Sequence, residues 1–239
     1  MQRYFSISNT NIELDPTDIH HIIHVMRNKV DDFFEIVFNQ KIYVEKITSI
    51  SPFTFECVDI YSMDNELNND ITLFYCLSKG DKNEFVIQKA TELGVKRIVL
   101  LSSKRSVVKL DDNDFNKKKV RLERIIKEAG EQSKRNVLPE LIGIIPIKSI
   151  KEDLLCKHNF VAYEEDAGNT LNTFDLLKDI KSGESVSVLI GSEGGIDKDE
   201  IEVLKKQGFK NISLGKRILR TETAAVYALS VIAFMLERK

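Results

Sequence analysis

Polar and apolar positions change their pattern at a turn-prone stretch, residues 65–70, which reads NELNND. Before it, short runs rich in β-branched and aromatic residues are separated by turn residues such as Asn39 and Gln40, a pattern typical of strands. We expect three of these strands over residues 34–38, 41–44 and 54–58. The pattern predicts a small β-barrel with one helix over residues 1–69.

Capping residues mark three helices. In the first, Asp15 stands at the N-cap, Pro16 occupies the first helical position, and apolar residues at helical spacing continue to Met26. The other two each combine an Asp N-cap with a Glu three residues later and a Gly beyond the end. Their signals are Asp81, Glu84 and Gly94, and Asp197, Glu200 and Gly208.

Beyond residue 70, apolar runs recur between amphipathic segments. We expect strands over residues 71–77, 98–101, 160–163, 186–190 and 212–214. Because strands and helices alternate, the pattern predicts an α/β fold with a largely parallel sheet over residues 70–239. Ligands of such sheets bind outside the carboxyl ends of the strands, where several loops converge.

The composition indicates a folded protein, with 42% hydrophobic and 30% charged residues, because disordered chains contain far fewer aliphatic residues. The longest apolar run, residues 224–236, is shorter than the roughly 20 residues that cross a bilayer. The N-terminus lacks the features of a secretory signal. We therefore expect a cytoplasmic protein without a membrane-spanning segment.

Neither the cysteines nor the histidines form a convincing metal site. Cys57, Cys76 and Cys156 lack CxxC spacing, which favours reduced core thiols over disulfides or zinc. His20 and His24 are one helical turn apart, but no nearby third ligand completes a set. We expect no metal.

Two glycine-containing stretches follow predicted strands. Residues 189–195 read LIGSEGG, and glycines there let a ligand approach the backbone closely. Their spacing differs from the GxGxxG and P-loop motifs that bind nucleotide phosphates, and from the GxSxG motif of hydrolases. Residues 214–224 read LGKRILRTETA and run from a short strand into a nearly all-apolar helix.

Together these stretches resemble the ribosomal RNA small subunit methyltransferase E family, whose members methylate N3 of a uridine in 16S ribosomal RNA. The resemblance extends through KGDKNEFVIQKATELGV at residues 79–95, SSKRSV at 102–107 and EAGEQSKRNVLPEL at 128–141. Two positions depart from the family pattern. Ser192 stands where proline is usual, and Asp31 stands near a usual glycine.

The resemblance implies a SPOUT-type, trefoil-knot methyltransferase domain over residues 70–239, preceded by a PUA-like β-barrel RNA-binding domain over residues 1–69. It implies S-adenosyl-L-methionine as the cofactor, held by loops at 163–166, 190–195 and 214–223. Backbone groups would bind the adenine, and apolar side chains would pack around it. The implied cofactor-binding residues are Tyr163, Leu189, Ile190, Gly191, Glu193, Gly194, Leu214, Gly215, Ile218, Leu219, Thr223 and Ala224.

Methyl transfer to N3 requires an aligned acceptor nitrogen and loss of the N3 proton. Arg220 is a candidate to hold the developing negative charge on uracil, or an RNA phosphate, because its guanidinium stays charged. Its alternative role is a structural salt bridge. Glu222 or Glu193 is a candidate proton acceptor, although Glu222 is also placed to stabilise a helix N-terminus. Arg220 and Glu222 are our catalytic candidates.

The net charge of −2 does not by itself indicate nucleic acid, and local basic clusters are ordinarily solvated helix faces. With the resemblance, we expect salt-sensitive binding to small-subunit ribosomal RNA or to the assembled small subunit. Candidate RNA contacts are Arg3, His24, Arg27, Lys104, Arg105 and Arg135. The helix over residues 223–236 is apolar nearly all round, which predicts burial either in the core or against another subunit, and the resemblance implies pairing there as a homodimer.

Two other functions stay open. One is a knotted methyltransferase acting on another RNA base or on a ribose hydroxyl, which mapping of the product would distinguish. The other is a non-catalytic RNA-binding assembly factor that kept the fold, which would fail to bind S-adenosylmethionine.

Overall fold

The computed structural model describes residues 1–63, 65–106, 108, 112–163 and 170–237. The chain divides into two compact units: the first contains Met1–Glu66 and Lys127–Val137, and the second contains Leu67–Ile126 and Leu138–Lys239. Patterning alone does not indicate that Lys127–Val137 packs with the N-terminal residues. No helix in the described part of the chain has the length and apolar character needed to cross a membrane.

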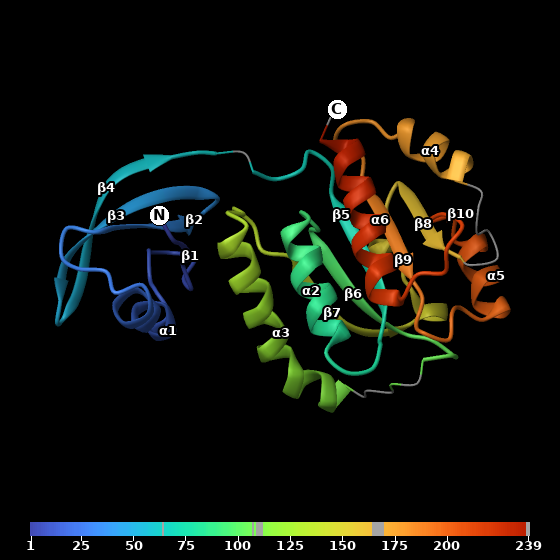
Figure 1. The fold of residues 1–239 in the computed structure, drawn as a ribbon, viewed down its shortest axis with the longest axis horizontal. Coiled ribbons are helices and arrows are strands. Elements are labelled where there is room, and N and C mark those ends of the chain that lie inside the picture. Colours follow the sequence, from blue (N-terminus) through green and yellow to red (C-terminus); the bar gives the residue numbers. More distant parts are fainter. Residues whose placement is uncertain (64, 107, 109–111, 164–169, 238–239) are drawn as a thin grey trace. The chain divides into compact units, whose positions relative to one another are not determined.

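A four-stranded sheet organises the first unit (Figure 1). In order across the sheet, its strands are β1 (Arg3–Phe5), β2 (Phe33–Phe38), β3 (Lys41–Ile50) and β4 (Phe53–Tyr61). β1 pairs in parallel with β2, whereas β2, β3 and β4 are successively antiparallel. All three predicted strands are confirmed. β1 was not predicted, because a strand of three residues is too short to show an alternating pattern.

The helix of the first unit begins where the sequence predicts. Asp15 Oδ1 accepts a hydrogen bond of 2.8 Å from the amide of Thr17, and Pro16 opens α1 (Pro16–His20). From the next residue the chain continues as a π-helical segment, η1 (His21–Val25), whose wider turn the apolar spacing did not predict. Ile22 of this segment is fully buried against the sheet core.

Left-handed backbone angles mark two turns of the first unit. Asn39 and Gln40 have φ of 49° and 61°, which confirms the predicted turn and matches a two-residue hairpin loop. Asp31 has φ of 75°, and its amide donates a hydrogen bond of 2.9 Å to the carbonyl of Ile47. Glycine adopts such angles at little cost, so a glycine near Asp31 in similar proteins has a physical reason.

A buried polar network joins distant segments of the first unit. Arg3, 1% exposed, donates hydrogen bonds of 2.9 Å from Nε to Glu35 and from Nη1 to the side-chain oxygen of Asn136. Arg135, 3% exposed, binds Glu66 through Nη2 at 2.6 Å and Nε at 3.1 Å. Buried charges are tolerated when they are paired in this way, so both arginines have a structural role in the first unit.

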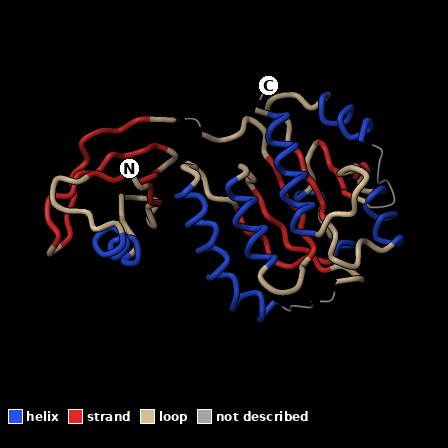
Figure 2. Tube along the Cα trace, in the orientation of Figure 1, coloured by secondary structure: helices blue, strands red, loops and turns tan. Residues whose placement is uncertain are grey.

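Six strands form the sheet of the second unit, and every pairing between them is parallel (Figure 2). In order across the sheet they are β10 (Phe209–Ile212), β8 (His158–Ala162), β9 (Val186–Ile190), β5 (Ile71–Cys76), β6 (Arg97–Ser102) and β7 (Glu140–Pro146). The predicted parallel α/β sheet is therefore confirmed. β7 was not predicted, and β10 ends at the residue where the predicted last strand begins.

The helices of the second unit include both helices with predicted N-caps. They are α2 (Lys82–Glu92), α3 (Asp112–Gln132, which continues into the first unit), α4 (Thr170–Lys178), α5 (Lys198–Lys206) and α6 (Thr221–Leu236), with short 3-10 turns η2 (Ile147–Ser149) and η3 (Glu152–Leu154). Asp197 caps α5 through a capping box with Glu200. Asp81 occupies the N-cap position of α2 without a side-chain cap hydrogen bond.

Strand side chains alternate between two apolar layers, as a two-residue period requires. On β5, Leu73 and Tyr75 belong to one layer, whereas Phe74 and Cys76 belong to the other. Side chains of α2, α3, α4 and α6 complete the first layer, and those of α5, η2 and η3 contribute to the second. Helices on both faces leave the carboxyl ends of the strands as the place where loops meet.

Candidate functional site

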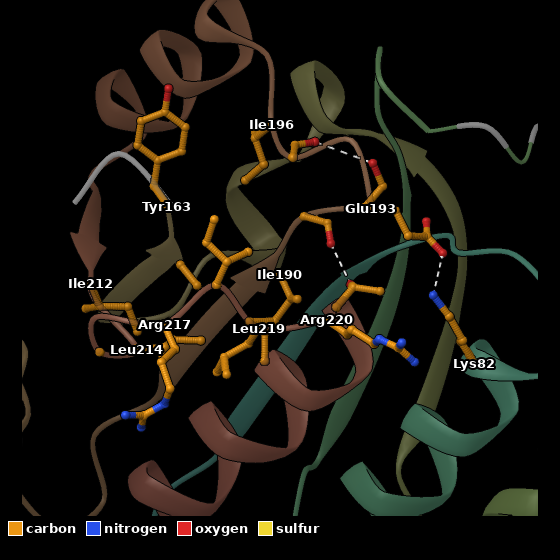
Figure 3. A pocket seen from close by; sticks show the side chains of 18 residues that line it. Lys82, Tyr163, Ile190, Glu193, Ile196, Ile212, Leu214, Arg217, Leu219 and Arg220 are labelled. Carbon is orange, nitrogen blue, oxygen red and sulfur yellow. Dashed lines mark hydrogen bonds and ion pairs between the residues drawn. The ribbon is translucent and has the colours of Figure 1, made fainter. Parts of the chain in front are cut away.

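A cavity of about 460 Å³ lies at the carboxyl ends of β8, β9 and β10 (Figure 3). Its size falls within the range of small-molecule sites. Most of its lining comes from the connections after β9 and β10, with α2 and α6 adding a few side chains. The lining residues are Lys82, Ala162, Tyr163, Ile190, Gly191, Ser192, Glu193, Gly195, Ile196, Ile212, Leu214, Gly215, Arg217, Ile218, Leu219, Arg220, Thr221 and Ala224.

The three glycines after β9 serve three different geometric needs. A Cβ on Gly191 would lie 2.8 Å from Cγ1 of Ile196, whose side chain lines the cavity. Gly195 has φ of 73°, an angle that other residues rarely adopt. A Cβ on Gly194 would lie 3.0 Å from the carbonyl oxygen of Arg105. The loop therefore depends on each glycine for a separate close approach or backbone angle.

The start of α6 is tied to the glycine loop. Thr221 is buried, and its hydroxyl donates a hydrogen bond of 2.7 Å to the carbonyl of Gly191. Gly215, in the connection that leads to α6, has φ of 108°, which favours glycine. The hydrogen bond from Thr221 holds the residue after Arg220 against the loop that follows β9.

Lys82 gathers two carboxylates at one side of the cavity. Its ammonium lies 3.0 Å from Glu193 Oε1 and 3.5 Å from Glu222 Oε2. Partial burial favours a higher pKa for Glu193, but hydrogen bonds from its own backbone amide and from Lys82 outweigh it and lower the pKa. A carboxylate held ionised in this way is a weak proton acceptor. Glu222 Oε2 is shielded from solvent, and apart from its ion pair with Lys82 it accepts no hydrogen bond from the described residues.

Two arginines of the connection after β10 point in different directions. In Figure 3 the guanidinium of Arg220 extends to the side of the cavity where Lys82 lies, whereas Arg217 extends to the opposite side. Within the described part of the chain, Arg220 has no ion-pair partner, and it is exposed. The alternative role of a structural salt bridge therefore finds no support among these residues, and the charge is available to a ligand.

Nine of the twelve predicted cofactor-binding residues line the cavity: Tyr163, Ile190, Gly191, Glu193, Leu214, Gly215, Ile218, Leu219 and Ala224. The remaining three, Leu189, Gly194 and Thr223, are not among its described lining residues. The prediction that the Leu189 side chain contacts the cofactor is wrong, because this side chain is fully buried in the apolar layer that contains Phe74. Of the predicted loop 163–166, only Tyr163 is among the described residues.

The structure also adds residues that the sequence prediction omitted. Ile196 and Ile212 extend the apolar wall, Thr221 fixes α6, and Lys82 supplies a cation. Lys82 lies within the segment at 79–95 that carried part of the resemblance, so a signal for it was present. Glu222 does not line the cavity itself but lies beside Lys82.

The predicted RNA contacts fall into two groups. His24, Arg27, Lys104 and Arg105 are exposed. Arg3 and Arg135 are buried and bound to carboxylates, which corrects the prediction that they contact RNA. Among the described residues, no group of three or more histidine, cysteine, aspartate or glutamate side chains is arranged to hold a metal ion.

Comparison with known proteins identifies the family of this chain. The model of the RNA methyltransferase domain matches residues 65–233, and that of the RNA methyltransferase PUA domain matches residues 14–59. The chain is 37% identical to the ribosomal RNA small subunit methyltransferase E of Bacillus subtilis, over 99% of this chain and 98% of the relative. The chain belongs to the ribosomal RNA small subunit methyltransferase E family. The predicted family is confirmed.

Solved structures of similar proteins agree with this family. A methyltransferase of Legionella pneumophila, described as bound to the cofactor SAM, matches with a TM-score of 0.85 at 28% identity over 96% of both chains. The ribosomal RNA small subunit methyltransferase E of Neisseria gonorrhoeae, bound to S-adenosyl methionine, matches with a TM-score of 0.81 at 26% identity over 98% of both chains. The predicted fold class, with its N-terminal PUA-like domain, is confirmed.

Proposed function

We propose that this chain methylates N3 of a uridine in 16S ribosomal RNA with S-adenosyl-L-methionine as the methyl donor. The observation that carries the proposal is the cavity formed by the glycine loop after β9 and the segment LGKRILRTETA. Arg220, which forms no ion pair with any described residue, lies at its side. Family membership and the cofactor named for two similar structures support the donor. The base and its N3 position rest on the family resemblance and on the chemistry below.

The residues around the cavity fit S-adenosylmethionine. Ile190, Ile196, Leu214 and Leu219 offer apolar surface for a purine ring. Gly191 and Gly195 line the cavity without side chains of their own, so the backbone of the loop can approach a ligand closely. Glu193 keeps a negative charge at the wall, which suits a cofactor carrying a sulfonium and an ammonium group. Bound there, S-adenosylmethionine supplies an activated methyl group.

The chain's own residues would prepare the acceptor. Arg220 presents a permanent positive charge, so it stabilises the negative charge that uracil gains as N3 loses its proton. Glu222 is the better candidate for receiving that proton, because Lys82 already holds Glu193 in its ionised form. We assign the same two residues, Arg220 and Glu222, to the transfer step.

RNA binding is assigned to exposed cations and to the PUA-like domain. We propose residues 1–69 as the RNA-binding domain and 70–239 as the methyltransferase domain, working in the cytoplasm as a homodimer. Tyr227 and Phe234 leave 45% and 55% of their surface exposed on α6, which supports burial of this helix against a second copy. His24, Arg27 and Lys104 remain candidate RNA contacts, for an RNA strand or an assembled subunit.

The decisive experiment is methylation of purified small ribosomal subunits with labelled S-adenosylmethionine, followed by nuclease mapping and mass analysis of the modified nucleotide. The expected product is a single N3-methyluridine in 16S ribosomal RNA. Label on another base or on a ribose would overturn the assignment of N3. Absence of both labelling and cofactor binding would favour a non-catalytic assembly factor.

A further inference from the structure

The turn between β6 and α3 packs directly on the glycine loop of the cavity. Ser103 and Ser106 close this turn through a hydroxyl contact of 2.8 Å, and the Ser106 amide donates to the Ser103 carbonyl at 3.1 Å. Ser106 is buried, so the turn is anchored at that end. The two residues at its tip, Lys104 and Arg105, are thereby held against the connection between β9 and α5.

Lys104 binds the start of α5 with its backbone as well as its side chain. Its amide donates a hydrogen bond of 2.8 Å to Glu200 Oε1, while Glu200 Oε2 accepts from the amide of Asp197 at 3.2 Å. The ammonium of Lys104 lies 3.1 Å from Asp197 Oδ1. Glu200 is buried, so it joins the turn and the capping box in one polar cluster.

Arg105 contacts Gly194 and Asp197 with its side chain and approaches Gly194 with its backbone. Its Nη1 donates a hydrogen bond of 3.3 Å to the carbonyl of Gly194, and its Nε lies 3.6 Å from Asp197 Oδ2. The space that a Cβ on Gly194 would need is occupied by the carbonyl oxygen of Arg105 at 3.0 Å and by its Cβ at 3.1 Å. Gly194 does not have a positive φ, so this close approach is the reason for a glycine there.

Gly194 lies between two residues that line the cavity, Glu193 and Gly195. A residue that fixes Gly194 therefore fixes the wall on both sides of it. We propose that Arg105 is a positioning residue for the cofactor cavity: it clamps Gly194 and Asp197, and so sets the glycine loop for S-adenosylmethionine instead of contacting RNA. The inference rests on the proposed function for the identity of the cofactor.

The test is calorimetric titration of the full chain with S-adenosylmethionine in the absence of RNA. Arg105→Ala removes the hydrogen bond to Gly194 and the charge beside Asp197, so Kd is expected to rise about five- to tenfold. Arg105→Lys keeps the charge but cannot bind Gly194 and Asp197 at the same time. Its Kd is therefore expected to lie between that of the wild type and that of Arg105→Ala. The melting temperature and the affinity for small-subunit RNA should change little.

Two matched controls separate positioning from general damage. Arg121→Ala removes another exposed arginine, which pairs with Glu84 at 2.8 Å and is not among the lining residues of the cavity, and should leave the cofactor Kd within about twofold. Gly194→Ala should weaken binding more than Gly143→Ala. At Gly143 the three atoms nearest to an added Cβ all belong to the Phe115 ring, the closest at 3.2 Å. If Gly194→Ala does not fold, Arg105→Ala still decides the matter.

A second measurement does not depend on the cofactor. Hydrogen exchange of the amides over residues 191–197 is expected to speed up in Arg105→Ala and to stay unchanged in Arg121→Ala. An unchanged exchange rate together with an unchanged cofactor Kd would overturn the inference. Weaker RNA binding with normal cofactor binding would also overturn it and would assign Arg105 to RNA. A wild-type chain with a protected loop that binds no S-adenosylmethionine would refute the proposed function alone.

Discussion

Two arginines of the first unit differ from one of the second unit in how their charge is used. In the first unit the two charges are buried and paired, whereas beside the cavity of the second unit the charge of one arginine is exposed. Arg3 and Arg135 are almost completely buried, and each is held by a carboxylate. Arg220 is exposed and has no ion-pair partner in the described part of the chain. A buried, paired charge contributes to folding, whereas a charge held unpaired beside a cavity is free to act on a ligand.

The largest expected effect is on the stability of the first unit. Arg3→Ala leaves Glu35 and the side chain of Asn136 without their buried partner. Glu35 keeps the Tyr61 hydroxyl at 2.9 Å and the Lys134 ammonium at 3.5 Å but loses its closest buried cation, so the free energy of unfolding should fall by about 3 kcal/mol. Denaturant titration measures this loss, with Lys41→Ala, at an exposed position, as the control. A loss below about 1 kcal/mol would mean that Arg3 is not structural.

Arg220 should show the reverse behaviour. Arg220→Ala is expected to lower kcat for methylation of small subunits about a hundredfold, because a donor facing developing negative charge is lost. The melting temperature and the Kd for S-adenosylmethionine should stay close to those of the wild type. Steady-state kinetics on purified subunits, with Arg121→Ala as control, tests this prediction. A fall in stability without a fall in kcat would contradict the prediction and would mean that Arg220 has a structural role, like Arg3.

The first unit also contains a carboxyl pair whose protonation should affect stability. Lys127 forms ion pairs with both Asp18 and Glu131, whose side chains are 7% and 9% exposed. Burial raises the pKa of Glu131 to about 7, and the nearby Asp18 adds to the rise while Lys127 opposes it. Two buried carboxylates therefore share one lysine.

A raised pKa means that the folded chain holds a proton that the unfolded chain releases. The stability from this group is fully present below about pH 4.5 and is lost as pH rises through about 7. Between pH 5 and 8 the loss should amount to about 2.5 kcal/mol, because each unit of pKa difference corresponds to about 1.4 kcal/mol. Glu131→Gln should remove this part of the pH dependence, measured as the difference in unfolding free energy between the two proteins from pH 5 to 8. A constant difference would refute the prediction.

Local patterns predicted most of the fold because they depend on neighbouring residues. Asp15 and Asp197 cap helices through bonds within two or three residues, and the turn at Asn39 and Gln40 needs only a local backbone angle. The π-helical geometry of η1 and the short strand β1 escaped prediction, because tertiary packing decides them. The attachment of Lys127–Val137 to the first unit also depends on contacts remote in sequence.

The candidate site was predicted in part for the same reason. The motifs at residues 189–195 and 214–224 marked two walls of the cavity, but only the fold showed which side chains face inward. Leu189 and Ile190 are adjacent, yet strand alternation places just Ile190 at the cavity. A sequence also gives no sign of whether an arginine is paired, so Arg3 and Arg220 were indistinguishable before the structure.

The smallest expected effect concerns Glu222, which lies between the two cases. It is 18% exposed and 3.5 Å from Lys82, so it is neither fully paired like Glu35 nor open like Arg220. Glu222→Gln keeps the shape of the side chain and removes the charge, so kcat should fall about tenfold if this group accepts the N3 proton. A role at the N-terminus of α6 alone predicts a different result, a loss of about 0.3–1 kcal/mol in stability with normal kcat. Measuring both quantities in one variant, with Glu237→Gln beyond the other end of α6 as control, decides whether Glu222 belongs with the structural charges or with Arg220.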